Sequence, residues 1–151
     1  MTRFEALVDY AYCRNVDTYS VYSDSKAKGC SVVGDMGASI VINKSNLNSS
    51  AEEFCTLAEE IGHIESCAVL PFEDYLNPRY KKYLKKKNEK RAESWAINKI
   101  IPAKMIQEAL DDCCYNNYEI AEYCGVSEDF LHKAFEYYNQ QGVVFKCAVC
   151  F

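Results

Sequence analysis

The chain has 151 residues, of which 49% are hydrophobic, so one ordinary domain can bury a core without disulfides or a structural metal. Its 17 basic and 22 acidic residues give a net charge of −5, which disfavours a general nucleic-acid binder, because such proteins are usually basic. The sequence has no run of 18 apolar residues and no basic-then-apolar start, so we expect a cytoplasmic protein without a membrane span or signal peptide.

The nine cysteines are an odd number at irregular spacing, which is a poor disulfide framework. In a reducing compartment we expect them to be thiols that pack as small hydrophobic side chains. Cys147 and Cys150 form a Cys-x-x-Cys pair, but the sequence has no second pair that would complete a structural zinc site. We therefore expect a C-terminal tail without a metal site.

The first third of the chain mixes helix and strand patterns. Residues 3–13 have the apolar spacing of a short amphipathic helix. Residues 16–43 are rich in strand-forming residues, interrupted by Ser, Asp and Gly clusters, and this predicts three short strands. Gly34 and Gly37 are placed to form a hairpin between two of these strands.

The middle of the chain predicts a helix over about 51–66. Ser49 or Ser50 is a suitable N-cap for it, and acidic residues follow in its first turn. A loop is expected around Pro71 and Pro78, because proline disfavours the helix interior.

The last third of the chain predicts helices only. Together with the strands of the first third, this gives an α+β fold with the sheet confined to the N-terminal part. The expected helices cover about 87–100, 102–113, 117–124 and 127–140.

A strongly basic stretch runs from residue 79 to residue 91, where eight of the thirteen residues are Lys or Arg. Such a stretch fits a solvent-exposed loop and helix face, and it also fits a docking site for an acidic partner or for nucleic acid. Of these, the solvated face is the simpler interpretation. The basic residues are Arg79, Lys81, Lys82, Lys85, Lys86, Lys87, Lys90 and Arg91.

The segment Glu59-Glu60-Ile61-Gly62-His63 lies within the predicted helix over 51–66. Glu59 and His63 are four residues apart and therefore share one helix face. The spacing matches His-Glu-x-x-His, in which two helical ligands bind zinc and the intervening Glu is the general base. Here Glu59 replaces the first His, a change that zinc chemistry allows, because zinc accepts carboxylate oxygen as well as imidazole nitrogen. Glu60 is then the candidate general base.

A catalytic zinc needs three protein ligands and one open position for water. The helix supplies two, and the next predicted helix offers Glu89 and Glu93 for the third. Taken alone, residues 59–63 fit a solvated helix face that carries a packed histidine better than they fit a metal site. The wider sequence has to decide between these interpretations.

The wider sequence resembles the ImmA/IrrE family of small metallopeptidases over roughly residues 5–138. Residues 39–43 and then Thr-Leu-Ala-Glu-Glu-Ile-Gly-His at 56–63 resemble that family's strand and active-site helix. Residues 89–102 resemble its second helix, and residues 118–131 resemble its C-terminal helical part.

This resemblance implies a small zincin-like fold. Its parts are an N-terminal helix, a short three-stranded sheet, an active-site helix and a C-terminal helical part. In domain terms it implies a single domain over 1–151. A metallopeptidase core would cover 1–100, a C-terminal helical subdomain 101–140 and a tail 141–151. By analogy with zincin-like folds, the strand at 38–43 is the expected edge strand beside the active-site helix, where an extended substrate adds.

The resemblance also implies the site and its chemistry. Glu89 is the third metal ligand beside Glu59 and His63, and Glu60 is the catalytic base. The expected metal is Zn²⁺, with Mn²⁺ or Fe²⁺ left open, because a Glu-His-Glu shell is harder than a His-His-Glu shell. The implied activity is a metallo-endopeptidase that cleaves a partner helix-turn-helix repressor and so derepresses a prophage or mobile element.

Two other functions remain open at this stage. The first is a non-catalytic antirepressor that has a degenerate metal site and holds the repressor without cutting it. The second is a DNA-binding regulator that uses residues 117–138, which have the pattern of a helix-turn-helix. Against direct nucleic-acid binding, the second helix of that pair carries Glu128, Asp129 and Glu136, and only Lys133 is basic.

Overall fold

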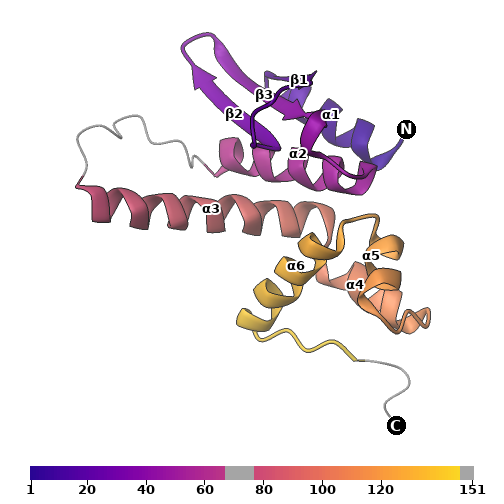
Figure 1. Ribbon diagram of the computed structural model, residues 1–151. Helices are drawn as coiled ribbons and strands as arrows, with labels where there is room; N and C mark the ends of the chain where they lie inside the picture. Colours follow the sequence, from indigo (N-terminus) through magenta and orange to yellow (C-terminus); the bar gives the residue numbers. More distant parts are fainter. Residues whose placement is uncertain (67–76, 147–151) are drawn as a thin grey trace.

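The computed structural model describes residues 1–66 and 77–146. The predicted loop at Pro71 and the Cys147–Cys150 pair lie outside these residues. The described part is α+β, as the sequence predicts, with an N-terminal helix, a three-stranded sheet and C-terminal helices (Figure 1). The elements are α1 (Arg3–Cys13), β1 (Val16–Val21), β2 (Gly29–Gly34), β3 (Gly37–Asn43), η1 (Lys44–Asn46), α2 (Ser50–Glu65), α3 (Pro78–Ile100), α4 (Ala103–Asp111), α5 (Asn117–Cys124) and α6 (Glu128–Gln140).

The sheet has the strand order β1-β3-β2, so β3 is the central strand. It pairs in parallel with β1 and in antiparallel with β2, and the β2–β3 hairpin closes at Gly34 and Gly37, as predicted. The prediction that 38–43 is an edge strand is therefore wrong. Ile40 and Ile42 are buried on the inward face of this strand, which is the environment of a central strand. The edge nearest to α2 is formed by β2.

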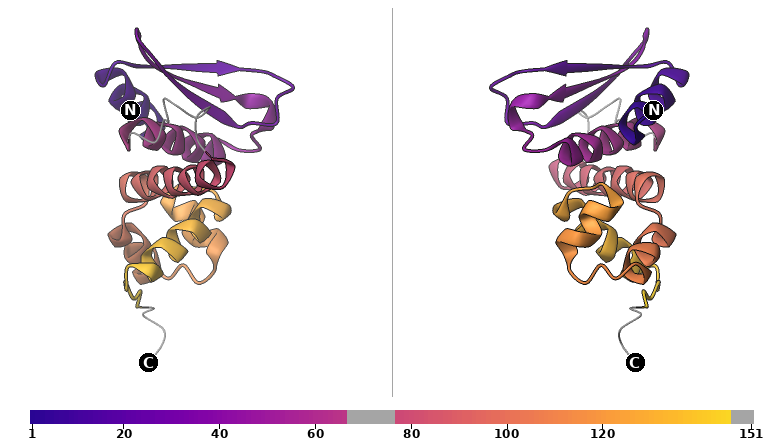
Figure 2. Two further views of the ribbon diagram at one scale, coloured as in Figure 1. Left: turned by 90° about the vertical axis from the view of Figure 1, so that its left-hand side faces the viewer. Right: turned by 90° about the vertical axis from the view of Figure 1, so that its right-hand side faces the viewer.

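The elements stack in layers (Figure 2). The sheet lies over α2, α3 lies against the other side of α2, and α4–α6 form a third group beyond α3. One continuous core of apolar side chains runs through these layers, from Ile40 of the sheet through Leu57 and Ile97 to Leu131 of α6. Burial of this kind is the main term that stabilises the fold.

The helix α2 begins as predicted, because the Ser49 side chain accepts a hydrogen bond from the Glu52 amide at 3.1 Å. The helix α3 begins nine residues earlier than the expected start at 87. Asn77 caps it through the Arg79 amide, and Pro78 occupies its first turn, where a missing amide hydrogen costs nothing. The expected loop at Pro78 is therefore wrong, and the whole basic stretch from 79 to 91 is helical.

The C-terminal helices are fixed to α3 by specific contacts. The Tyr138 hydroxyl donates to the Ile101 carbonyl at 3.0 Å, and the Asn98 amide donates to the Tyr137 hydroxyl at 2.8 Å. Gly125 ends α5 in a left-handed conformation with φ of 64°, which turns the chain into α6.

Within residues 1–66 and 77–146, no helix combines the length and apolar character needed to cross a membrane.

Candidate functional site

The site forms where α2 and α3 cross at very short distance. A Cβ added to Gly62 would lie 2.4 Å from the Ala92 carbonyl oxygen, so only glycine permits this contact. The two helices run antiparallel (Figure 1). Glu59 and His63 stand three residues before and one residue after Gly62, and Glu89 and Glu93 stand in the same positions around Ala92. With antiparallel axes these positions turn to the same side of the helix pair.

His63 and Glu89 meet on this side. His63 Nε2 lies 3.4 Å from Glu89 Oε2. Two ligands that each bind zinc at about 2.1 Å in a tetrahedral shell lie about 3.4 Å apart, so this separation suits a shared ion. The structure thus brings His63 and Glu89 together, two of the three residues that the sequence resemblance implies as ligands.

Glu59 has a different neighbour, the ammonium group of Lys133 on α6. Lys133 Nζ lies 2.5 Å from Glu59 Oε1 and 3.8 Å from Glu93 Oε2. Burial lowers the pKa of Lys133, but the hydrogen bond to Glu59 and the charges of Glu59 and Glu93 outweigh it, and the net pKa is raised. Lys133 is therefore charged at neutral pH. In the sequence, Lys133 stands out only as a single basic residue on an acidic helix, because 74 positions separate it from Glu59.

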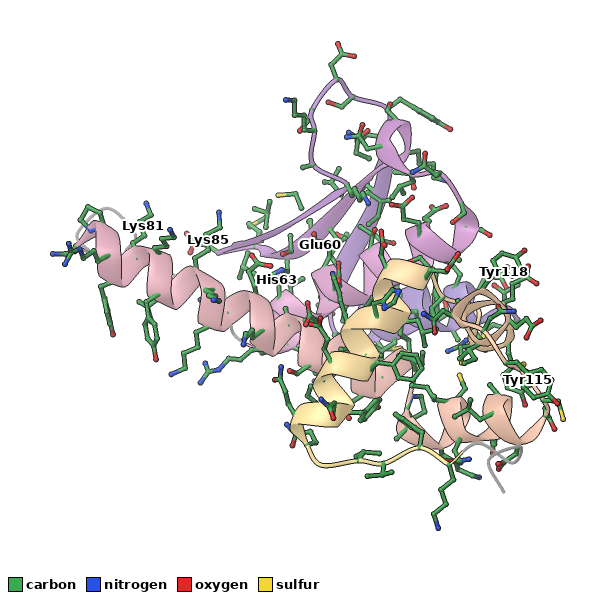
Figure 3. All side chains as sticks on the ribbon, turned by 60° about the horizontal axis from the view of Figure 1, so that its bottom comes forward. Glu60, His63, Lys81, Lys85, Tyr115 and Tyr118 are labelled. Carbon is green, nitrogen blue, oxygen red and sulfur yellow. The ribbon has the colours of Figure 1, made fainter. Side chains whose placement is uncertain are left out.

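Glu60 points to the other neighbour of α2, the strand β2. A Cβ on Gly29 would lie 2.9 Å from Glu60 Cγ and Oε1, so glycine at this position leaves room for the carboxylate. Burial raises the pKa of Glu60, and an interaction with the Ser31 side chain and the charge of His63 oppose the shift. Figure 3 shows Glu60 and His63 close together on α2. The site thus holds a desolvated carboxylate beside an imidazole.

One cavity of about 130 Å³ connects these groups. Each water takes about 30 Å³ of liquid volume, so this space suits an ion with a few waters. Carboxylates and the single imidazole make its walls strongly acidic, with one ammonium opposing them. The lining residues are Glu59, Glu60, His63, Glu89, Ala92, Glu93 and Lys133.

The donor set of Glu59, His63 and Glu89 fits a divalent metal in kind, since zinc, manganese and iron all accept carboxylate and imidazole. Within residues 1–66 and 77–146, no group of three or more His, Cys, Asp or Glu side chains is arranged to hold a metal ion. The arrangement departs from a closed shell at Glu59, whose Oε1 is paired with the Lys133 ammonium. In the described residues the fit is therefore one of donor chemistry and not of arrangement: the carboxylates and the imidazole suit a divalent metal, and the Lys133 ammonium is the cation that Glu59 holds.

Comparison with known proteins gives one match. The family model Peptidase_M78, described as the IrrE N-terminal-like domain, matches residues 15–136. No curated protein matches the chain significantly, and no solved structure does so. The matched range contains all the residues that line the acidic cavity.

Proposed function

Because the chain belongs to the IrrE N-terminal-like family of metallopeptidases (Peptidase_M78), we propose that it is a metal-dependent endopeptidase that cleaves a helix-turn-helix repressor. The observation that carries this proposal is the meeting of His63 and Glu89 beside the desolvated Glu60 in one acidic cavity. The resemblance to the ImmA/IrrE family supports the repressor as substrate and derepression of a prophage or mobile element as the outcome. Such a target implies action in the cytoplasm.

Glu59, His63 and Glu89 would hold the metal, most simply Zn²⁺. When bound, a divalent metal supplies a Lewis acid that polarises the scissile carbonyl and makes a water molecule more acidic. The Gly62–Ala92 contact keeps the two helices close enough for His63 and Glu89 to share one ion.

Glu60 is the proposed proton carrier. A carboxylate in water is a weak base, but burial raises the pKa of Glu60 above its ordinary value of 4.5. A base with a pKa closer to the working pH transfers protons more effectively. Glu60 would accept a proton from the attacking water and pass it to the leaving amine, while Ser31 and the space above Gly29 keep its carboxylate in place.

The strand β2 is the proposed substrate platform, in place of the strand at 38–43. It pairs with β3 on one side only and lies against α2. An extended peptide that adds to its outer edge by main-chain hydrogen bonds would run past Ser31 and Glu60. The same strand would thus orient both the substrate and the base.

The test is incubation of the purified chain with its candidate repressor and mass spectrometry of the products. We expect one discrete cut, its loss with a chelator, and at least about a 100-fold slower cut with Glu60→Gln. Glu65→Gln is the matched control, because Glu65 lies on the same helix but pairs with Arg14 at 3.3 Å, outside the cavity. Equal cleavage by wild type and Glu60→Gln would show that the hydrolytic mechanism is wrong.

A second candidate function is a non-catalytic antirepressor, and the Glu59–Lys133 pair is the observation that favours it. An internal ammonium on a ligand position is what a site that no longer needs metal would retain. This function predicts that metal-free protein forms a stoichiometric complex with the repressor and leaves it intact. A complex that forms only with metal and releases cut repressor would exclude it.

A further inference from the structure

Lys133 reaches the acidic cavity from a helix that is itself firmly held. Its neighbours on α6, Phe130, Leu131 and Ala134, are all buried in the core. The Cα of Lys133 is therefore fixed, while its side chain is 41% exposed and keeps rotamer freedom at its end. Within the described residues, it contributes the one ammonium group that lines this cavity.

The ammonium of Lys133 and a divalent metal require the same carboxylate. Glu59 Oε1 is 2.5 Å from Lys133 Nζ, and Glu59 is also the first of the three proposed ligands. A divalent metal held by Glu59 would share this carboxylate with the ammonium, and two cations on one carboxylate repel each other. The ammonium and the metal ion therefore cannot both bind Glu59 without a loss of binding affinity.

Glu93 offers Lys133 a second partner. Its Oε2 is 3.8 Å from Lys133 Nζ, so a modest rotation of the lysine side chain exchanges one carboxylate for the other. Glu93 is half-buried and its pKa is raised, chiefly by burial, so a closer ammonium would favour its charged form. Of the carboxylates that line the cavity, Glu59 and Glu89 are the proposed ligands, and Glu93 can receive the displaced lysine.

We propose that Lys133 is a built-in competitor for the metal, which holds Glu59 in the metal-free protein and moves to Glu93 when the metal binds. The C-terminal helix α6 thereby sets the metal affinity of a site built on α2 and α3. This inference rests on the metal site of the proposed function, and it adds a residue that neither binds the metal nor touches the scissile bond.

The test is the Zn²⁺ affinity of the full chain, measured by competition with a chromogenic chelator, so that no substrate or activity is needed. We expect Lys133→Met to bind Zn²⁺ about tenfold more tightly than wild type, because the competing charge is removed. Lys133→Arg retains the charge and should stay within about threefold of wild type. Lys104→Met is the matched control, since Lys104 is 87% exposed and pairs with Glu108 far from the cavity.

A double-mutant cycle with Glu93→Gln tests the exchange itself. In the wild-type background, we expect Glu93→Gln to weaken Zn²⁺ binding about fivefold, because Lys133 loses its alternative partner. In the Lys133→Met background, Glu93→Gln should have no effect. An equal loss in both backgrounds would make Glu93 a ligand and overturn the exchange.

Two further outcomes separate this inference from the proposed function. Equal or weaker Zn²⁺ binding by Lys133→Met, with circular dichroism showing the native fold, would overturn the competition alone. Absence of Zn²⁺ binding in wild type, Lys133→Met and Lys133→Arg together would overturn the metal site and the inference with it.

Discussion

The two halves of α3 share one helix but have opposite surroundings. From residue 88 to residue 100, five residues are buried, mostly against α2, and this half carries Glu89 and Glu93. From residue 78 to residue 87, no residue is buried, and basic side chains dominate. Figure 1 shows the half that contains residues 88–100 stacked on α2. The comparison teaches that close packing positions the site residues, whereas burial in the core constrains no side chain of the exposed half.

The largest effect is expected from a cavity in the buried half. Ile97 is fully buried, so Ile97→Ala removes apolar contacts and leaves a void. We expect the free energy of unfolding to fall by about 3 kcal/mol. Urea denaturation followed by circular dichroism measures it. A loss below about 1 kcal/mol would mean that this half is not the packed one, and the comparison would fail.

The next effect comes from the helix crossing. Gly62→Ala puts a Cβ 2.4 Å from the Ala92 carbonyl oxygen and must push α2 and α3 apart. We expect a loss of about 2 kcal/mol in unfolding free energy, together with weaker Zn²⁺ binding, because His63 and Glu89 separate. Gly34→Ala is the control, since its Cβ would meet nothing within 4 Å, and it should change stability by less than about 0.5 kcal/mol. Similar behaviour of the two variants would argue against the close crossing.

A pH-dependent effect is expected at Glu93, in the buried half. Burial raises its folded-state pKa above the ordinary value of 4.5, so the folded protein holds this proton more tightly than the unfolded chain. The resulting stabilisation is present below pH 4.5 and is lost as the pH rises through the folded-state pKa. Glu93→Gln stays neutral, so its stability relative to wild type should increase from pH 4.5 toward neutrality in chelator-treated protein. A stability difference that is constant with pH would contradict this.

The smallest effect is expected in the exposed half. Replacement of Lys82, Lys85 and Lys86 by Gln should change the unfolding free energy by less than about 0.5 kcal/mol for each residue. Cleavage of the repressor by this triple variant then distinguishes the two interpretations of the basic stretch. Unchanged cleavage supports a solvated face, and a higher KM with unchanged stability supports a docking site for an acidic partner.

The sequence predicted best the elements whose signals are local. Ser49 and the Gly34–Gly37 hairpin identify the start of α2 and the β2–β3 turn through capping and turn chemistry. The pattern of residues 59–63 likewise needs only one helix to bring Glu59 and His63 to one face. The proximity of Glu89 to His63 came from the resemblance to a known family, and the structure agrees with it.

The predictions from sequence were wrong or incomplete where long-range packing determines the structure. The first nine residues of α3 bury nothing, so they have no apolar periodicity, and the Asn77–Pro78 start signal was the only cue. The central place of β3 depends on which strands pair with it, which its own residues do not specify. Lys133 was missed as a site residue because a core of apolar contacts, and no nearby motif, brings α6 to the cavity.

The most direct test of the account is metal analysis of the purified chain by mass spectrometry, for wild type, Glu59→Ala, His63→Ala and the control Glu65→Ala. The account predicts about one divalent ion per wild-type chain and per control chain, as a three-ligand site holds, and a large loss in the two ligand variants. Equal metal content in all four proteins would contradict the metal centre on α2.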